Sequence, residues 1–351
     1  MERLDVGLLC NAPTQRLKDG LSLFENLGLY RAMTIFGAAY GVKIGIFGID
    51  DLQVGEDELH GTAIVWQNGT FEIVEAKLPQ HLESIFTINK RFMSPYPQEI
   101  GDALIRKNIS KINPTKDKIP QILFAAGLAE YAIPSITASC FEEICRGIAM
   151  WKNCVVKPIN GKRGRGVLYA EYADGKLLYE SVQEKAELTQ ESWEQYCRSV
   201  PQYKEFLVQP RLNFHNRAGQ AIDFRVLVSK GGNGTWEIVD IYVRHGLNHL
   251  VSNVAEGGLL GSAKEYLKSE FGDEDRKLYQ ILCDLGTKVP QAYELALQDR
   301  AESFYGIDVG IDLDTLTPYV IEVNAFPGTC FHKYHLAEKR VQYYQYLISQ
   351  E

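Results

Sequence analysis

Three separated fragments of this chain carry residues that suit phosphate and metal chemistry. Lys157 follows an apolar run, and a glycine-rich stretch begins four residues later at Gly161. Far downstream, Glu322 and Asn324 follow an acidic stretch that contains Asp308. Basic side chains and flexible backbone amides suit phosphate groups, whereas carboxylates and an amide supply the oxygen ligands that a hard divalent cation prefers. Together the fragments predict one nucleotide site with a divalent cation.

The glycine-rich stretch, residues 161–166, reads Gly-Lys-Arg-Gly-Arg-Gly. Its three glycines, Gly161, Gly164 and Gly166, allow backbone N–H groups to approach phosphate oxygens closely, and Arg163 adds positive charge. The spacing matches neither a Walker loop nor a dinucleotide fingerprint. The alternative interpretation is a solvated basic turn between two strands. The position of Lys157 just before the stretch favours a phosphate-binding loop.

The acidic stretch is predicted to be a hairpin of two strands. Because side chains alternate between the faces of a strand, Asp308 and Asp312 share one face, and Glu322 and Asn324 share a face of the next strand. The short turn can set these faces side by side, which gives a cluster of oxygen ligands suited to Mg²⁺. A solvent-facing polar edge is the alternative, but apolar neighbours surround Glu322 in the sequence, and a buried unpaired carboxylate is unfavourable.

Two arginines lie on the strands of a second predicted hairpin. Arg225 and Arg244 can make bidentate contacts with phosphate or carboxylate, and a polar, glycine-containing loop that begins at Asn253 follows them. Surface arginines on a hairpin are the alternative. The stretch 330–335, Cys-Phe-His-Lys-Tyr-His, has no second pair of metal ligands in view, so we interpret it as the beginning of a helix.

Bulk properties narrow the function further. The 351 residues suffice for two or three domains, and the net charge of -8 argues against nucleic acid as the main partner. The start of the chain lacks the apolar segment of a signal peptide, and no apolar run is long enough to cross a membrane. The seven cysteines are scattered and form no CxxC pair, so we expect a reducing, cytoplasmic location and no membrane partner.

The apolar periodicity and the turn residues predict a mixed α/β and α+β fold. A β-α-β opening is expected over strand 4–10, helix 22–40 and strand 42–49, with a hairpin turn at Asn68-Gly69. Downstream, helices are expected over 118–130, 141–150, 190–199, 274–299 and 333–349, and strands over 167–172, 177–179, 206–209, 223–228, 236–244, 307–313 and 318–324.

With these residues in place, the chain from about residue 112 to its end resembles the ATP-grasp superfamily of carboxylate–amine ligases. The motifs occur in the family's order: Lys116 before a helix, Lys157, Gly161–Gly166, Val208-Gln209, Asp223-Phe224-Arg225, Asn253 followed by Gly257-Gly258, and Asp308 followed by Glu322-Val323-Asn324. The segments DFRVLV, VSNVAEGG and GIDVGID…IEVN look most like the YheC/YheD-type ATP-grasp group that is associated with endospore coats.

The resemblance implies a pre-ATP-grasp α/β domain (1–112) and two lobes that clamp ATP, an N-terminal lobe (113–204) and a C-terminal lobe (205–351). It also implies the site residues. Phosphate would contact Lys116, Lys157 and the loop residues Gly161, Arg163, Gly164 and Gly166; adenine would lie at Gln209 and Leu212; the γ-phosphate and acyl intermediate would face Arg225 and Asn253; Mg²⁺ would bind Asp308, Glu322 and Asn324. Lys118 competes with Lys116, and Asp312 competes with Asp308.

The function that follows is an ATP-dependent carboxylate–amine ligase that uses ATP and Mg²⁺ and acts through an acyl phosphate. Its substrates would be a small-molecule or peptide carboxylate and an amine, and a homo-oligomer is compatible with the sequence. One alternative is an ATP-grasp kinase that phosphorylates a small molecule or peptide. The other is a non-catalytic, spore-coat-associated binding or structural protein, which the presence of Lys157, Glu322 and Asn324 argues against.

Overall fold

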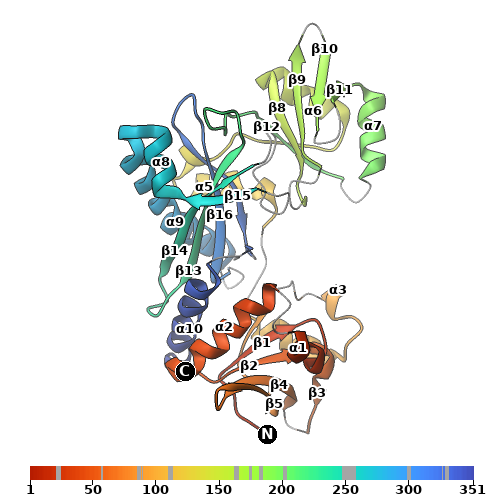
Figure 1. The fold of residues 1–351 in the computed structure, drawn as a ribbon. Coiled ribbons are helices and arrows are strands. Elements are labelled where there is room, and N and C mark those ends of the chain that lie inside the picture. Colours follow the sequence, from red (N-terminus) through yellow and green to blue (C-terminus); the bar gives the residue numbers. More distant parts are fainter. Residues whose placement is uncertain are drawn as a thin grey trace.

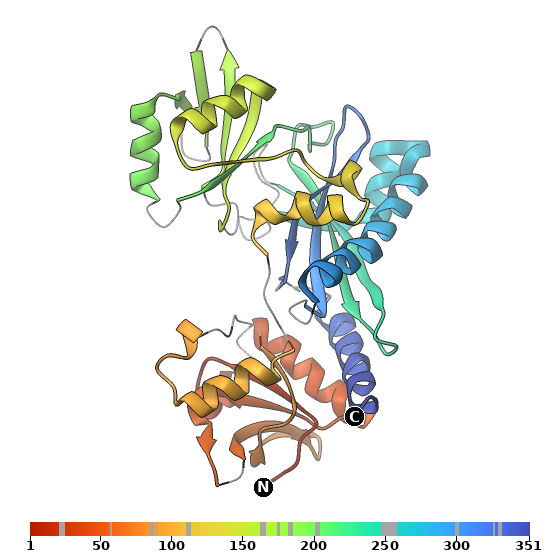
Figure 2. The same cartoon turned by 180° about the vertical axis from the view of Figure 1, so that it is seen from behind.

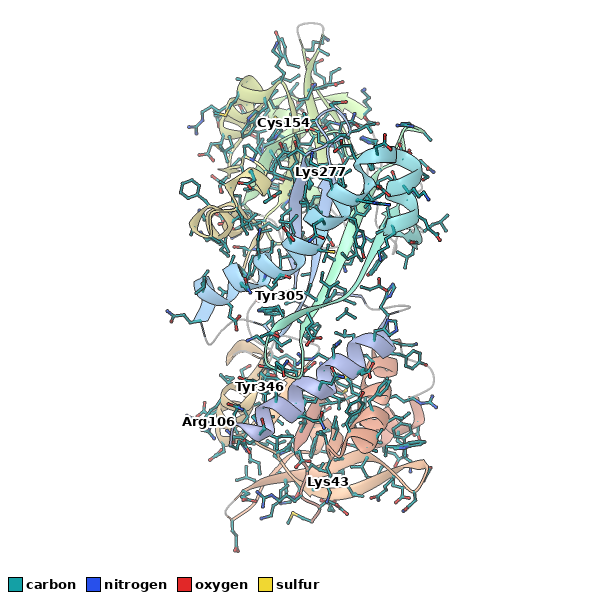
Figure 3. The ribbon with its side chains drawn as sticks, turned by 90° about the vertical axis from the view of Figure 1, so that its left-hand side faces the viewer. Lys43, Arg106, Cys154, Lys277, Tyr305 and Tyr346 are labelled. Carbon is teal, nitrogen blue, oxygen red and sulfur yellow. The ribbon has the colours of Figure 1, made fainter. Side chains whose placement is uncertain are left out.

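The structure is a computed structural model, and it groups the chain around three β-sheets. It describes residues 1–20, 25–56, 58–84, 88, 90–109, 114–161, 166–173, 176–181, 185–200, 204–246, 258–298, 302–325, 327–328 and 332–351. Figure 1 shows an N-terminal unit at the bottom, a second unit at the top and a third between them at the left. The labelled residues of Figure 3 mark the same three levels: Lys43 below, Tyr305 in the middle and Cys154 above. This mixture of sheets and helices confirms the predicted fold class.

The first sheet begins with the predicted β-α-β unit. Its strand order is β3-β4-β2-β1-β6, with β5 paired to β4, and β1 runs parallel to both β2 and β6. Asn68 and Gly69 have φ values of 53° and 77°, which suit the predicted hairpin turn. The elements are β1 (Val6–Cys10), α1 (Thr14–Gly20), α2 (Glu25–Tyr40), β2 (Ile44–Gly48), η1 (Ile49–Asp51), β3 (Gln53–Val54), β4 (Leu59–Gln67), β5 (Thr70–Lys77), β6 (His81–Ser84), α3 (Lys90–Met93) and α4 (Gln98–Lys107).

The second sheet has the order β11-β10-β9-β8-β12-β7. Helices α6 and α7 cover one face, where they share an apolar core with alternate residues of β8, β9 and β12. The elements of this part of the chain are η2 (Lys116–Lys118), α5 (Ile119–Ala125), η3 (Ala129–Tyr131), β7 (Ile136–Ala138), α6 (Phe141–Trp151), β8 (Asn153–Pro158), β9 (Leu168–Ala173), β10 (Lys176–Glu180), β11 (Lys185–Glu187), α7 (Gln190–Ser199) and β12 (Phe206–Pro210).

The third sheet is antiparallel, with the order β15-β14-β13-β16-β17. Its apolar face packs against α5, α8 and α9, whereas α10 contacts β13 and β14 and reaches down to α2 (Figure 2). The elements are β13 (Ile222–Lys230), β14 (Trp236–His245), β15 (Leu259–Ser262), α8 (Ala263–Phe271), η5 (Gly272–Glu274), α9 (Asp275–Leu297), β16 (Phe304–Ile311), β17 (Pro318–Asn324) and α10 (Lys333–Ser349).

The order of the elements in the sequence does not match the order of the sheets to which they belong. Helix α5 packs into the core of the third sheet, although it precedes the second sheet, and β12 pairs with β8 in the second sheet. The predicted boundary at 112/113 lies outside the described residues, and the three domain ranges stay predictions. The elements β6, α4, β15 and α8 were not predicted. The strands β6 and β15 have four residues each, which is too short for an apolar pattern to stand out.

No described helix combines the length and the apolar character that a membrane crossing requires. The six cysteines within the described ranges are all free thiols, in agreement with the expectation that the scattered cysteines form no disulfide framework.

Candidate active site

The open face of the second sheet carries Lys157. Because β8 alternates, Lys157 and Val155 point away from the core that α6 and α7 cover. The register places Lys157 opposite Leu207, and places Val155 between Gln209 on β12 and Tyr169 on β9. Lys157 is only 8% exposed, so its ammonium group lies in a largely desolvated position on this face.

Lys116 joins the second sheet to the acidic hairpin of the third. Its ammonium group donates a hydrogen bond of 2.7 Å to the carbonyl of Gly161 and lies 3.4 Å from Oε1 of Glu322. Its competitor Lys118 instead pairs with Asp117 at 3.1 Å, and its side chain is half exposed. The structure therefore brings Lys116, Gly161 and Glu322 together, whereas the described contact of Lys118 is made with its own neighbour in the sequence.

The pKa of Lys157 is affected by the same charged residues, Lys116 and Glu322. Burial and the nearby charge of Lys116 lower the pKa of Lys157 from 10.5 to about 8, and Glu322 and Asp308 only partly offset them. A buried ammonium group with insufficient negative charge around it is poorly satisfied in the protein alone. An anion placed between Lys116 and Lys157 would relieve this deficit.

The glycine-rich stretch is described at its two ends. Gly166 has a φ of 75°, and a Cβ there would lie 2.8 Å from Pro158 and 3.0 Å from the hydroxyl of Tyr196. That hydroxyl donates a hydrogen bond of 2.8 Å to the Gly166 carbonyl, which fixes the end of the loop against α7. Glycine is therefore required at position 166 by both conformation and space. Arg163 and Gly164 lie outside the described residues, and their phosphate-binding roles stay predictions.

The acidic hairpin forms as predicted and aligns its polar residues. The register pairs Asp308 with Glu322 and Gly306 with Asn324, and an irregularity follows between Asp308 and Val309. Asp312 lies at the turn, where its carboxylate accepts a hydrogen bond of 3.0 Å from the backbone N–H of Asp314. The contacts of the described residues thus connect Asp308 to the cluster around Glu322, whereas this contact holds Asp312 in the hairpin turn.

Asp308 is the centre of a buried ion-pair cluster. Arg225 donates to it from Nε and, at 3.1 Å, from Nη2; Arg244 lies 2.9 Å away, and the Asn324 amide donates at 3.2 Å. Arg244 also donates to Asp223 from Nε and, at 2.6 Å, from Nη2. Burial alone would raise the pKa of Asp308, but the two arginines outweigh it and hold the pKa below its usual value.

The hydrogen bonds and ion pairs of Asp308 limit its availability as a metal ligand. A carboxylate offers about four lone-pair positions, and four N–H donors already approach Asp308. Glu322 has a side chain 30% exposed, and Asn324 gives its N–H to Asp308, which leaves its amide oxygen as the atom that suits a cation. Among the described residues no three His, Cys, Asp or Glu side chains gather as a metal site. Glu322 and the amide oxygen of Asn324 suit Mg²⁺, which usually keeps waters and substrate phosphates as its other ligands. Asp308 would have to release one of its four N–H donors before it could serve as a third ligand.

The predicted adenine residues lie where β12 leaves the second sheet. Gln209 is buried, and its side-chain N–H donates a hydrogen bond of 2.7 Å to Ser135. Leu212 is half-buried, and its carbonyl accepts a hydrogen bond of 3.1 Å from Phe214. Because the Gln209 amide is engaged, we expect the backbone rather than this side chain to contact a base.

Sequence reasoning did not single out Tyr169, which contacts Arg211 directly after β12. The guanidinium of Arg211 stacks 4.4 Å from the centre of the Tyr169 ring, and both residues line a small recess on the open face of the second sheet. The available signal was the alternation of β9, which places Tyr169 opposite Val155. Asn253, like Arg163 and Gly164, lies outside the described residues, so its catalytic role stays a prediction.

Solved structures with the same fold include ligases. D-alanyl-alanine synthetase A from Vibrio cholerae O1 biovar eltor superimposes with a TM-score of 0.54 at 11% identity, over 99% of this chain and 97% of that one. The ATP-grasp ligase PsnB, complexed with minimal precursor, Mg and ADP, gives a TM-score of 0.50 at 12% identity, over 98% and 97%. At these identities the likeness shows the fold alone, and it confirms the predicted two-lobed ATP-grasp architecture.

Sequence comparison gives the family. The endospore coat-associated protein YheC of Bacillus subtilis (strain 168) is 27% identical over 206 residues, which cover 56% of this chain and 55% of that protein, so the chain spans about half the length of this curated relative. A family model described as YheC/D-like ATP-grasp matches residues 109–350, which include all of the candidate site residues named above. The chain therefore belongs to the YheC/D-like ATP-grasp family.

Proposed function

We propose that this protein is an ATP-dependent carboxylate–amine ligase that acts through an acyl phosphate. The observation that carries the proposal is the contact of Lys116 with both the Gly161 carbonyl and the Glu322 carboxylate. It joins the start of the glycine-rich loop to the acidic hairpin, and Lys157 lies in the same electrostatic neighbourhood. In the proposed site, the cations for phosphate groups and the oxygen ligands for a divalent cation would therefore lie next to one another.

In the first step, an oxygen of the substrate carboxylate attacks the γ-phosphorus of ATP, the bond to the bridging oxygen breaks, and ADP leaves. Lys116 and Lys157 would neutralise the charge on the phosphate oxygens, and the loop residues Gly161, Arg163, Gly164 and Gly166 would bind the same groups. Mg²⁺, when bound by Glu322, Asn324 and Asp308, would supply further neutralisation of the transferring phosphoryl group.

In the second step, an amine attacks the acyl carbon and inorganic phosphate leaves, which gives an amide. Arg225 would stabilise charge that develops on the phosphoryl group, and Asn253 would face the same intermediate. Gln209 and Leu212 would hold the adenine. This chemistry needs no protein nucleophile, because the carboxylate and the amine are themselves the nucleophiles.

The relatives support a substrate class but no specific substrate. The neighbours are named as a D-alanyl-alanine synthetase and a ligase complexed with a precursor, which supports small-molecule or peptide substrates. We include in the proposal a cytoplasmic location and action without nucleic acid or membrane. The endospore-coat association belongs to YheC, and whether it extends to this chain is a separate question from catalysis.

The first test is nucleotide binding to the full chain. Saturating Mg-ATP should stabilise the folded protein, by about 2.7 kcal/mol at one hundred times the dissociation constant. Glu322→Gln keeps the shape of the side chain but removes a ligand charge, so it should reduce phosphate release by orders of magnitude while the protein stays folded. Near-normal phosphate release by a folded Glu322→Gln protein would remove the metal assignment.

Product analysis separates the ligase from its alternative. A screen of amino acids, short peptides and cell-wall precursors should find a pair that yields ADP, free phosphate and an amide, identified by mass spectrometry. A kinase would transfer the phosphoryl group to its acceptor and release no free phosphate. If Mg-ATP leaves thermal unfolding unchanged, the protein is the non-catalytic module instead.

A further inference from the structure

A row of side chains leads away from the ion-pair cluster along β14. Arg244, Tyr242 and Asp240 are two residues apart, so they share one face of the strand, and that is the face opposite the apolar core. The register puts Arg244 beside Asp223 and Tyr242 beside Arg225. Directly opposed residues have Cβ atoms about 4.5–5.5 Å apart, so Tyr242 lies next to the arginine expected at the reacting phosphate.

Of the segment between Asn324 and α10, the described residues Pro327 and His332 contact residues of this same face. Pro327 lies 2.6 Å from the position that a Cβ of Gly306 would take, and Nη1 of Arg225 lies 3.0 Å from that position. At the other end of this segment, the His332 ring stacks on Tyr242 with a centroid distance of 4.5 Å and an interplanar angle of 12°. The chain therefore places Pro327 beside Arg225, and places His332 one ring further along the row.

His332 is held on two sides. Its Nδ1 lies 2.5 Å from Oδ2 of Asp240, and its ring face lies on Tyr242. The His332 side chain remains 18% exposed and that of Asp240 34% exposed, so the pair is accessible to a small molecule. A carboxylate that accepts a hydrogen bond from Nδ1–H selects one tautomer, in which Nε2 is the basic nitrogen.

The second step of the proposed reaction needs such a base, because an amine that attacks an acyl carbon must lose a proton. We propose that His332, oriented by Asp240, is the general base that accepts this proton from the amine substrate. The inference rests on the proposed ligase function and adds to it a catalytic residue, His332, and a positioning residue, Asp240.

The bonds and protons of this second step are all accounted for by the amine, the acyl phosphate and His332. The amine nitrogen uses its lone pair to form the C–N bond, the C–O bond to phosphate breaks, and phosphate leaves with that electron pair. One N–H proton passes to Nε2 of His332 and from there to solvent or to the departing phosphate. Nothing is oxidised or reduced, and no further reactant is required.

The test compares two nucleophiles on the full chain with Mg-ATP and the standard amino acids as carboxylate probes. Glycinamide is an amine that is substantially protonated near neutral pH and requires a base during attack, whereas hydroxylamine is largely uncharged and strongly nucleophilic. In His332→Gln, amide formation with glycinamide should fall by about 100-fold or more, within the usual range for general-base catalysis. Hydroxamate formation should stay close to the wild-type level, because the acyl phosphate still forms.

Asp240→Asn should reduce amide formation in the same selective way, since the amide can no longer fix the Nδ1–H tautomer. The matched control is His81→Gln, because His81 also pairs with a carboxylate, Glu351, at 3.1 Å but belongs to the first sheet. It should leave both products unchanged. If His332→Gln does not fold, His332→Asn provides the same comparison with a shorter amide.

The outcomes separate the two proposals. An equal loss of amide and hydroxamate in His332→Gln would show a structural histidine, and unchanged formation of both would likewise overturn the assignment of the base, while the ligase function stands. If wild-type protein forms neither product with any probe and releases no phosphate, the proposed function is wrong, and the base assignment is withdrawn with it.

Discussion

Two buried charge networks in this molecule have opposite electrostatic characters. In the first, Arg340 of α10 donates to Glu83 of β6 from Nη2 and, at 3.2 Å, from Nε, while Tyr344 donates to the same carboxylate at 2.6 Å. Arg340 also donates to the Ser303 carbonyl at 3.1 Å. Arg340 is fully buried and Glu83 is 1% exposed, so this network closes on itself between the first sheet and α10.

In the second network, around Lys157 and Asp308, the carboxylates do not fully compensate the buried charge of Lys157. Burial lowers the pKa of Lys157 to about 8, and the nearby carboxylates do not restore it. Burial also acts to lower the pKa of Arg340, but Glu83 outweighs it and raises that pKa above the usual value. The opposite directions indicate that the protein compensates the charge of Arg340 more fully than that of Lys157. We therefore expect Arg340 to stabilise the fold and Lys157 to bind an anion from outside.

The closed network should give the largest change in stability. Arg340→Met leaves Glu83 as a buried charge without its partner, so unfolding should require about 3–5 kcal/mol less free energy. Urea denaturation of wild type and variant measures this difference. The double variant Arg340→Met/Glu83→Gln should recover part of the loss, because it removes the unpaired charge. A loss below about 1 kcal/mol in Arg340→Met would contradict the distinction between the networks.

The open network should respond in the opposite direction. Lys157→Met should stabilise the protein without nucleotide by about 1–3 kcal/mol at pH 7, because it removes a desolvated charge, and should weaken Mg-ATP binding. The lysine has a pKa of about 8 when folded and 10.5 when unfolded. Between these values the unfolded chain binds more protons than the folded one. The free energy of unfolding of the wild type therefore rises relative to that of the variant as the pH rises, and the two become similar near pH 10.

Urea denaturation at pH 7 and pH 10 and calorimetry with Mg-ATP test this prediction. Lys118→Met is the matched control, because Lys118 is a half-exposed lysine nearby that pairs with Asp117. It should change neither stability nor nucleotide affinity appreciably. Destabilisation by Lys157→Met at pH 7 would show that the protein alone already satisfies this lysine.

The smallest effect should come from an ion pair that belongs to neither network. Lys176 and Glu187 lie 3.1 Å apart on β10 and β11, with side chains 61% and 47% exposed. Lys176→Ala should change the free energy of unfolding by less than about 0.5 kcal/mol, since solvent screens such pairs. A thermal denaturation series in rising salt checks this, and a large, salt-independent loss would mean that exposure does not separate these classes of ion pair.

Sequence reasoning was most successful where pattern and turn chemistry act locally. Lys157, the acidic hairpin and the hairpin that carries Arg225 were all placed on strands that the structure contains. The family followed from the order of the same motifs. The roles assigned to individual site residues stay predictions, although the structure brings Lys116, Lys157 and Glu322 together.

The sequence by itself determined which residue types are available and on which strand face each lies, because alternation is a local property of the chain. Tertiary structure alone decided which of them meet. Lys116 contacts Glu322, which lies 206 positions further along the chain, and Asp240 meets His332 only because α10 begins over β14. Such contacts depend on how sheets and helices pack, and a single sequence without packing does not specify them. Lys157 and Arg340 are both buried, and the opposite directions of their pKa shifts are equally a property of the folded whole.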